Sequence, residues 1–166
     1  MKKTILLFAL ILLTAPVSFS QKKITTFILL RHAEKGSDDP KDPELKPEGV
    51  ERANRVVKML GKTSVDAIYS TTFKRTRNTV APLAKEKGLE VLTYEAFKVQ
   101  EIEKMLEKHA GGTVVISGHS NNIPWIANLL IGKEELKDYD DSDYGNILIV
   151  SVVEKGKVAK VTWLSY

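Results

Sequence analysis

Charged and titratable side chains follow three apolar runs that are typical of buried strands. The side chains that could do chemistry there are Arg31, His32 and Glu34 after the first run, Ser70 and Arg75 after the second, and Ser117, His119, Ser120 and Asn121 after the third. Parallel strands present their carboxyl ends at one edge of a sheet, which is where α/β folds bind ligands. We therefore expect these side chains to share one crevice.

Two arginines in such a crevice indicate an anionic ligand with several oxygens. The guanidinium groups of Arg31 and Arg75 can each bind phosphate oxygens in pairs. A helix that begins close by, as expected after Ser70, would add free backbone N–H groups of matching polarity. Phosphate is the ligand that this set of groups predicts.

The two histidines of the crevice extend the prediction from binding to chemistry. An imidazole can attack phosphorus when one ring nitrogen is unprotonated and the other is held by a hydrogen bond. A second histidine that is kept cationic can stabilise charge on the transferred oxygens. Because His32 and His119 both follow strands and both have an arginine nearby, we favour a catalytic role over a purely structural one.

The apolar pattern predicts the elements that position these side chains. Short β-type runs alternate with stretches of helical period, which indicates an α/β domain with a largely parallel sheet. Strands are expected at 24–30, 65–70, 91–94, 113–117, 146–153 and 158–164. Helices are expected at 47–60, 75–87 and 124–132, and from 99 to the glycine pair at 111–112. Trp125 and Trp163 lie in apolar helix and strand patterns, so both are predicted to be in the core.

The first twenty residues have the pattern of a secretory signal peptide. Lys2 and Lys3 precede an apolar run at 5–13, and small residues follow up to Ser20. The run is far shorter than the roughly 20 residues of a membrane-spanning helix. We therefore expect cleavage after Ser20, one mature domain over residues 21–166, location in the periplasm or outside the cell, and no stable membrane insertion.

Composition excludes several classes of function. The chain has 166 residues and no cysteine, so it has no disulfides and no thiolate chemistry. Its formal net charge of +4 includes the two lysines of the expected signal peptide. The remaining positive bias is too small to indicate nucleic-acid or membrane binding.

Three segments of the sequence resemble the motifs of the histidine phosphatase superfamily, which includes the cofactor-dependent phosphoglycerate mutases. They are "LLRHAEK" at 29–35, "YSTTFKRTRNT" at 69–79 and "VVISGHSNNIP" at 114–124. The resemblance implies a three-layer α/β/α sandwich with helices on both faces of the sheet. It also implies phosphomonoester hydrolysis through a covalent phosphohistidine, without a metal or other cofactor.

The resemblance assigns roles to the residues of these motifs. It implies that His32 is the nucleophile, that Arg31, Arg75 and His119 complete the phosphoryl pocket, and that Asn121 contributes a further contact. Glu34 matches a carboxylate of the family, and two roles are open for it. It either takes part in catalysis directly or forms a salt bridge that orients an arginine.

The general acid has no clear match. One branch of the family places an aspartate directly after the second histidine, where this chain has Ser120. Glu95 matches the acid of the mutases in chain order, although the surrounding "TYEAF" lacks their motif, and it could equally be a solvated residue before a helix. The acidic loop "KDYDDSDYGN" at 137–146 is either solvated or folds over the pocket, where Tyr139 and Tyr144 could contact the organic part of a substrate.

The short connection between the second and third helices favours a phosphatase over a mutase, which must shield its phosphoenzyme from water. Family members of similar size with signal peptides include lipopolysaccharide heptose phosphatases, which this chain resembles, so a sugar phosphate or an envelope glycolipid phosphate is a candidate among small phosphorylated substrates.

Two alternatives to a metal-independent phosphatase are a phosphate-binding module without turnover and a metal-dependent hydrolase that uses His32, Glu34, His119 and an aspartate.

Overall fold

The computed structural model of the protein describes residues 23–166. The predicted signal peptide and its cleavage point lie outside the described residues. The elements in chain order are β1 (Thr25–Arg31), α1 (Pro47–Leu60), β2 (Ala67–Ser70), α2 (Lys74–Lys87), β3 (Val91–Thr93), α3 (Val99–Lys108), β4 (Thr113–Gly118), α4 (Asn122–Ile131), β5 (Asn146–Glu154) and β6 (Val158–Ser165). Each predicted element is present, with bounds that differ by two or three residues at most.

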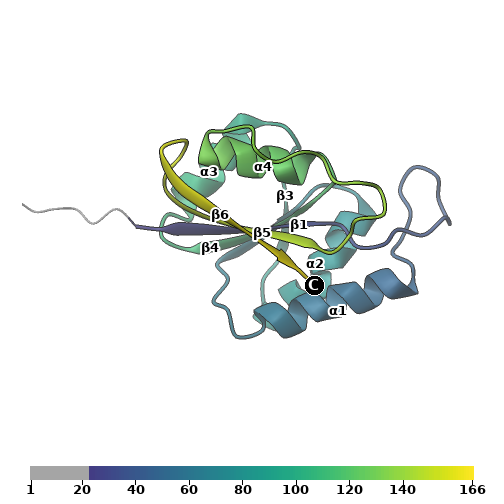
Figure 1. Ribbon diagram of the computed structural model, residues 1–166. Coiled ribbons are helices and arrows are strands. Elements are labelled where there is room, and N and C mark those ends of the chain that lie inside the picture. Colours follow the sequence, from purple (N-terminus) through teal and green to yellow (C-terminus); the bar gives the residue numbers. More distant parts are fainter. Residues whose placement is uncertain (1–22) are drawn as a thin grey trace, which may run out of the picture.

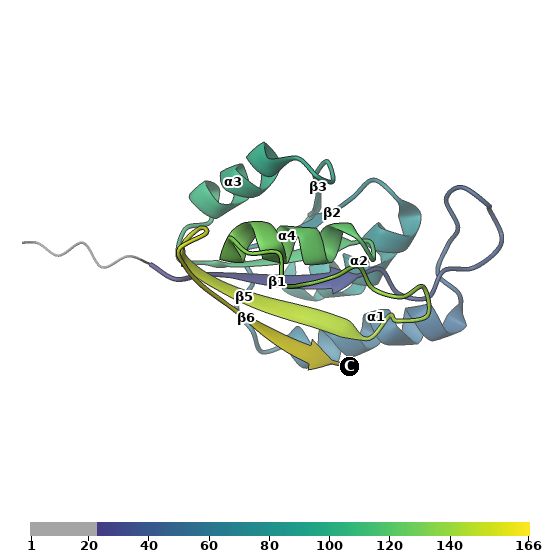
Figure 2. The same cartoon turned by 45° about the horizontal axis from the view of Figure 1, so that its top comes forward.

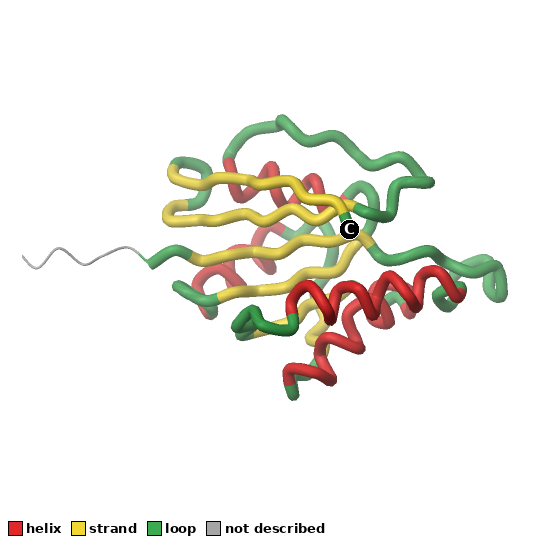
Figure 3. Tube along the Cα trace, turned by 60° about the horizontal axis from the view of Figure 1, so that its bottom comes forward, coloured by secondary structure: helices red, strands yellow, loops and turns green. Residues whose placement is uncertain are grey.

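Six strands form one sheet in the order β3-β2-β4-β1-β5-β6. The four strands from β3 to β1 are parallel, whereas β5 and β6 run antiparallel to their neighbours. The yellow strands of Figure 3 lie side by side in this sheet. The sheet is therefore largely parallel, as predicted, with an antiparallel hairpin at one edge.

Helices cover both faces of the sheet, which makes the fold the three-layer sandwich that was expected. In Figures 1 and 2, α1 and α2 lie on one side of the sheet and α3 and α4 on the other. Alternate residues of β1 divide between the two cores: Phe27 and Leu29 pack with the α3 and α4 side, and Ile28 and Leu30 with the α1 and α2 side. This alternation follows from the two-residue period of a strand.

Helix α1 shows why the helical period was readable. Pro47 is at the first position, where its missing N–H costs nothing, and Ala53, Val56 and Leu60 are buried at helical spacing. Val50, which fits the same period, is nevertheless 48% exposed because it lies at the margin of the buried face. No helix of the described residues is long and apolar enough to cross a membrane.

The prediction that Trp163 belongs to the core is wrong, since its side chain is 51% exposed. Trp163 lies near the end of β6, which is the edge strand of the sheet. Its indole Nε1 donates to Asn146 Oδ1 at 2.6 Å. Trp125 is partly buried on α4 and packs against the core, as predicted.

Candidate functional site: a pocket at the carboxyl ends of three parallel strands

A pocket of about 600 Å³ opens where β1, β2 and β4 end. It is lined by Arg31, His32, Lys35, Thr71, Thr72, Phe73, Arg75, Tyr94, Glu95, Ala96, Phe97, His119, Ser120, Asn121 and Asp141. The structure thus brings together the arginines, the histidines and Asn121 that the sequence singled out. Glu34, Ser70 and Ser117, which the sequence also placed in the crevice, do not line it.

Arg31 is buried and held by the loop between α4 and β5. Its Nη1 donates to the carbonyl oxygens of Asp140 at 2.7 Å and Asp143 at 2.9 Å, and the guanidinium carbon lies 4.3 Å from the centre of the Tyr144 ring. The side chain is only 3% exposed. The acidic loop therefore does reach the pocket, but its two hydrogen bonds with Arg31 come from backbone carbonyls and not from carboxylates.

His32 is buried and has one ring nitrogen committed to the backbone. Nδ1 lies 2.8 Å from the carbonyl oxygen of Ala33, which can only accept, so Nδ1 carries the proton in the neutral ring. Burial lowers the pKa of His32 from 6.5 to about 3, and the nearby Arg31, His119 and Arg75 add to this effect. At neutral pH, Nε2 is therefore an unprotonated nitrogen, as nucleophilic attack requires.

His119 is neutral in the free pocket, contrary to the expectation of a cationic ring. Burial lowers its pKa from 6.5 to about 4, helped by the charges of Arg75, Arg31 and Lys35. The ring lies edge-on to His32, with 5.5 Å between the ring centres. The sequence does not reveal this state, because it depends on burial of the ring and on how closely the arginines approach it.

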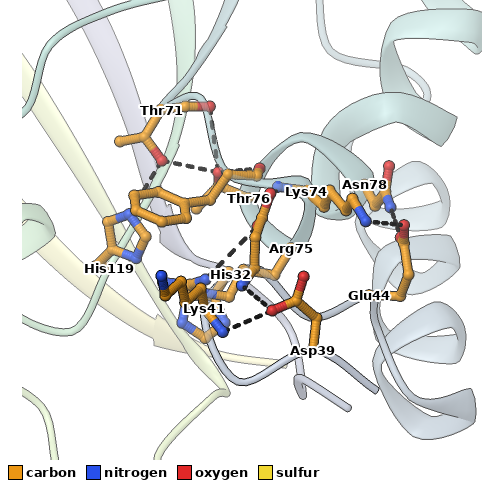
Figure 4. A network of polar contacts seen from close by, with 12 residues as sticks. His32, Asp39, Lys41, Glu44, Thr71, Lys74, Arg75, Thr76, Asn78 and His119 are labelled. Atoms are coloured by element: carbon orange, nitrogen blue, oxygen red, sulfur yellow. Dashed lines mark hydrogen bonds and ion pairs between the residues drawn. The ribbon is translucent and has the colours of Figure 1, made fainter. Parts of the chain in front are cut away.

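A chain of buried hydroxyl groups orients His119, as Figure 4 shows. Thr76 Oγ1 donates to the carbonyl of Phe73 at 2.7 Å, and Thr71 Oγ1 lies 2.8 Å from Thr76 Oγ1 and 3.0 Å from His119 Nε2. Since Thr76 uses its proton on the carbonyl, Thr71 donates to Thr76 and accepts from Nε2. The neutral ring therefore carries its proton on Nε2.

Arg75 lies in the first turn of α2, where a loop from elsewhere in the chain holds it. Asp42 accepts a hydrogen bond from the backbone N–H of Lys74 at 2.9 Å, and its carboxylate lies 3.9 Å from Arg75 Nη1. The ring of Phe73 packs against the guanidinium, with 4.3 Å between the ring centre and the guanidinium carbon. Asp42 thus satisfies a free N–H of the helix terminus and positions the arginine beside it.

Thr79 connects the segment that carries His32 with the helix that carries Arg75, and the sequence analysis gave it no role. Its buried hydroxyl accepts from the backbone N–H of Ala33 at 2.8 Å and donates to the carbonyl of Arg75 at 2.7 Å. One side chain of α2 therefore fixes the backbone beside His32. The small polar threonines of "YSTTFKRTRNT", placed in an otherwise buried turn and helix, were the signal that could have revealed this network.

Glu34 takes the structural role of the two that were open. Its carboxylate receives hydrogen bonds from Arg52, from Nε at 3.0 Å and from Nη2 at 2.7 Å. These contacts lower the pKa of Glu34 against the opposing effect of burial. Arg52 also donates to the carbonyl of Tyr166 at 2.7 Å. The expectation that Glu34 faces the crevice is wrong, because it turns toward α1.

The other candidate acids lie at the rim of the pocket. The Glu95 side chain is 68% exposed and forms an ion pair with Lys98 at 2.5 Å. Asp141 is fully exposed, 3.7 Å from Arg31 Nη2. Tyr139 is buried against Trp163, and Tyr144 stacks on Arg31, so neither of these tyrosines lines the pocket.

Asn121 lines the pocket with an exposed side chain, whereas the adjacent Asn122 is buried and structural. Asn122 Oδ1 accepts from the backbone N–H of His119 at 2.6 Å, and its Nδ2 donates to the Tyr94 hydroxyl at 2.9 Å. Gly118 is required here, because a Cβ at that position would lie 2.4 Å from Asn122 Oδ1. These contacts fix the backbone that carries His119.

A metal site formed by His32, Glu34, His119 and an aspartate would lack one of its ligands, because the Glu34 carboxylate is hydrogen-bonded to Arg52. Within residues 23–166, no group of three or more histidine, aspartate or glutamate side chains is arranged to hold a metal ion. The cationic Arg31 and Arg75 surround the histidines instead. This arrangement suits an anion.

Comparison with protein families gives one match. Residues 27–99, from β1 to the start of α3, match the family model of the histidine phosphatase superfamily (branch 1). The matched segment contains Arg31, His32 and Arg75, and it ends before His119. No curated protein sequence matches the chain significantly.

Several solved structures resemble the fold. A mycobacterial glucosyl-3-phosphoglycerate phosphatase has a TM-score of 0.68 at 15% identity, covering 86% of this chain and 99% of that one. The protein histidine phosphatase SixA, complexed with tungstate, has a TM-score of 0.66 at 13% identity, covering 84% and 96%. A phosphoserine phosphatase from Entamoeba histolytica, in complex with 3-phosphoglyceric acid, has a TM-score of 0.64 at 18% identity, covering 86% and 98%. At these identities the likeness concerns the fold.

Proposed function

We propose that this phosphatase of the histidine phosphatase superfamily hydrolyses phosphomonoesters with His32 as its nucleophile. The observation that carries the proposal is the state of His32. Its Nδ1 is bonded to the Ala33 carbonyl, its Nε2 is unprotonated, and Arg31 and Arg75 lie beside it.

The first step transfers the phosphoryl group to the enzyme. His32 Nε2 forms a bond to phosphorus while the bond from phosphorus to the ester oxygen breaks, and the departing oxygen takes a proton from water. The Nε groups of Arg31 and Arg75 are buried without a hydrogen-bond partner among the described residues. Since buried donors are nearly always satisfied, these two support binding of the phosphoryl oxygens.

His119 would stabilise the transferred group after it gains a proton. A dianion next to an imidazole favours the charged form of the ring, so phosphoryl binding is expected to raise the pKa of His119 from its low value in the free pocket. The new proton goes to Nδ1, because Nε2 already donates to Thr71. The resulting cation stabilises charge as the oxygens move in the transition state.

The second step releases phosphate. Water attacks phosphorus, the bond from phosphorus to His32 Nε2 breaks, and the nitrogen recovers its lone pair. The proton lost by the water passes to solvent or to the phosphate. Neither step needs a metal ion, because the two arginines and His119 supply the positive charge.

The substrate and the location are further parts of the proposal. Structural neighbours include phosphatases described for glucosyl-3-phosphoglycerate and phosphoserine, which supports a small phosphorylated molecule as the substrate. A sugar phosphate or an envelope glycolipid phosphate fits this class. We propose export to the periplasm or medium on the basis of residues 1–20 alone.

The test is turnover of p-nitrophenyl phosphate by residues 21–166 without added metal. We expect a burst of product, an acid-labile phosphoenzyme and inhibition by vanadate, with turnover reduced more than about ten-thousandfold in His32→Ala. Retained turnover in His32→Ala would overturn the assignment. Phosphate binding with neither burst nor turnover would favour the binding module, and loss of activity with EDTA that zinc restores would favour the metal-dependent reading.

A further inference from the structure

Two exposed phenylalanines line the pocket beside the phosphoryl-binding residues. The side chains of Phe73 and Phe97 are 38% and 50% exposed, although most large apolar side chains of the described residues are buried. A pocket that combines a few convergent polar groups with aromatic walls is typical of a site for a ligand with an apolar part. The two rings are therefore placed to contact the organic part of the substrate.

Phe73 contacts the phosphoryl-binding residues directly. Its ring centre lies 5.1 Å from that of His119 with the planes at 90°, and 4.3 Å from the guanidinium carbon of Arg75. The ring is thus positioned by two residues that would hold the phosphoryl group. Its exposed part borders the space next to that group, which is where a leaving group must lie.

Phe97 lies on the short connection between β3 and α3, in a backbone conformation that large side chains rarely adopt. Its φ is 60°, and it is the only described residue other than glycine with a positive φ. Its ring packs edge-on against Trp125, with 5.4 Å between the ring centres. Strained residues persist where surrounding contacts hold them, and they cluster at ligand sites. The packing on Trp125 holds the Phe97 ring at the pocket despite the unfavourable backbone conformation.

The carboxyl groups of the pocket give a second, independent indication. Glu95 and Asp141 are both exposed, and each is paired with a cation, Lys98 and Arg31 respectively. Within the described residues, no buried carboxyl group lines the pocket. A leaving group that departs without an enzymatic acid must be a weak base. The phenol of tyrosine has a pKa of about 10, whereas alkyl alcohols, like water, are far weaker acids.

We propose that the pocket selects phosphomonoesters whose leaving group is an aromatic ring, with Phe73 and Phe97 in contact with that ring. The proposal rests on the proposed function, since it concerns the same site, and among small phosphorylated substrates it favours aryl esters over sugar and glycolipid phosphates. During transfer, the bond from phosphorus to the aryl oxygen breaks and the electron pair stays on that oxygen. The aryl oxide then takes a proton from water.

The experiment separates contact with a ring from acidity of the leaving group. Phenyl phosphate is compared with hexafluoroisopropyl phosphate, an alkyl ester whose alcohol is about as acidic as phenol. The two esters are assayed with the wild type, Phe97→Leu and Phe97→Tyr. We expect kcat/KM for phenyl phosphate to fall about fivefold in Phe97→Leu, the size of one aromatic pair. Phe97→Tyr should keep the wild-type value, and the alkyl ester should be unaffected by either change.

Trp163→Leu provides the matched control, because Trp163 is an exposed aromatic residue outside the pocket. It should leave both esters unchanged. Equal kcat/KM for the two esters in the wild type, or an equal loss for both in Phe97→Leu, would overturn the proposal while leaving the phosphatase function intact. Absence of turnover and of phosphoenzyme with every ester would instead overturn the function itself. A phosphotyrosyl peptide assayed in parallel distinguishes a protein side chain from a free aryl ester, and the same Phe97 dependence with either supports the proposal.

Discussion

The floor and the rim of the pocket differ in almost every physical respect. The floor consists of Arg31, His32, Arg75 and His119. Arg31 and His32 are buried, and each is held by hydrogen bonds to backbone carbonyls. At the rim, Lys35, Glu95 and Asp141 are exposed side chains. The floor has one geometry for one chemical group, the phosphoryl group, whereas the rim can vary without disturbing it. Chemistry and specificity are thus placed in separate parts of one pocket.

Removal of a floor guanidinium should have the largest effect. We expect Arg75→Ala to lower kcat/KM for p-nitrophenyl phosphate by about a hundred- to a thousandfold, because a preorganised charge on the transferred oxygens is lost. Arg75→Lys should recover only part, since an ammonium cannot form two parallel N–H bonds. Arg77→Ala is the control, because Arg77 lies on the same helix outside the pocket. A change of less than about threefold in Arg75→Ala would contradict the role of the floor.

The neutral histidines of the floor make stability depend on pH. Their pKa values, about 3 for His32 and about 4 for His119, lie below the unfolded value of 6.5, so the unfolded chain binds more protons as the pH falls below 6.5. The contribution of the two histidines to the free energy of unfolding is fully present above pH 6.5. Below pH 6.5 it decreases by about 1.4 kcal/mol per pH unit for each histidine. Denaturant titrations between pH 7 and pH 5 measure this slope. His32→Gln should lower it by about half, and an unchanged slope would refute the assignment.

Loss of the Thr79 hydroxyl should loosen the floor without removing any of its charges. Thr79→Val keeps the size of the side chain but leaves the buried N–H of Ala33 without an acceptor. An unsatisfied buried donor costs about 1–3 kcal/mol, and we expect a loss of that size in the free energy of unfolding. Thr79→Ser keeps the hydroxyl and should keep more of the activity. Equal kcat in the valine and serine variants would show that the bond does not position His32.

Changes at the rim should have the smallest effect on p-nitrophenyl phosphate. Glu95→Gln removes an exposed carboxylate and its ion pair with Lys98, and we expect kcat/KM to change by less than about fivefold. Asp141→Asn is the parallel variant on another loop of the rim. A loss of a hundredfold or more in Glu95→Gln, confined to esters of poor leaving groups, would identify Glu95 as the general acid and would weaken the contrast between floor and rim.

The sequence was sufficient for those features that depend on local pattern. Pro47 and the apolar spacing up to Leu60 marked α1 to the residue, and the apolar runs placed Arg31, His32 and His119 at strand ends. The topological rule for parallel sheets then brought these residues to one edge. Each of these inferences used neighbours in sequence or a general property of the fold.

Features that depend on contacts between distant segments could not be predicted. Trp163 is exposed because β6 is the edge strand, and strand order is not visible in an apolar pattern. Glu34 pairs with Arg52 because α1 passes beside it, which decides between two roles that fit the motif equally well. The neutral state of His119 depends on burial together with charges from β1 and α2. The left-handed backbone of Phe97 has no signature in "TYEAF".

Strand order also determines when the pocket can exist. β4, which leads into His119, lies between β1 and β2, although it is made after both. Until Thr113–Gly118 inserts, the strand before His32 and the strand before Arg75 have no shared neighbour to hold them in register. The phosphoryl pocket therefore requires β4, because this one strand leads into His119 and also joins the strand before His32 to the strand before Arg75.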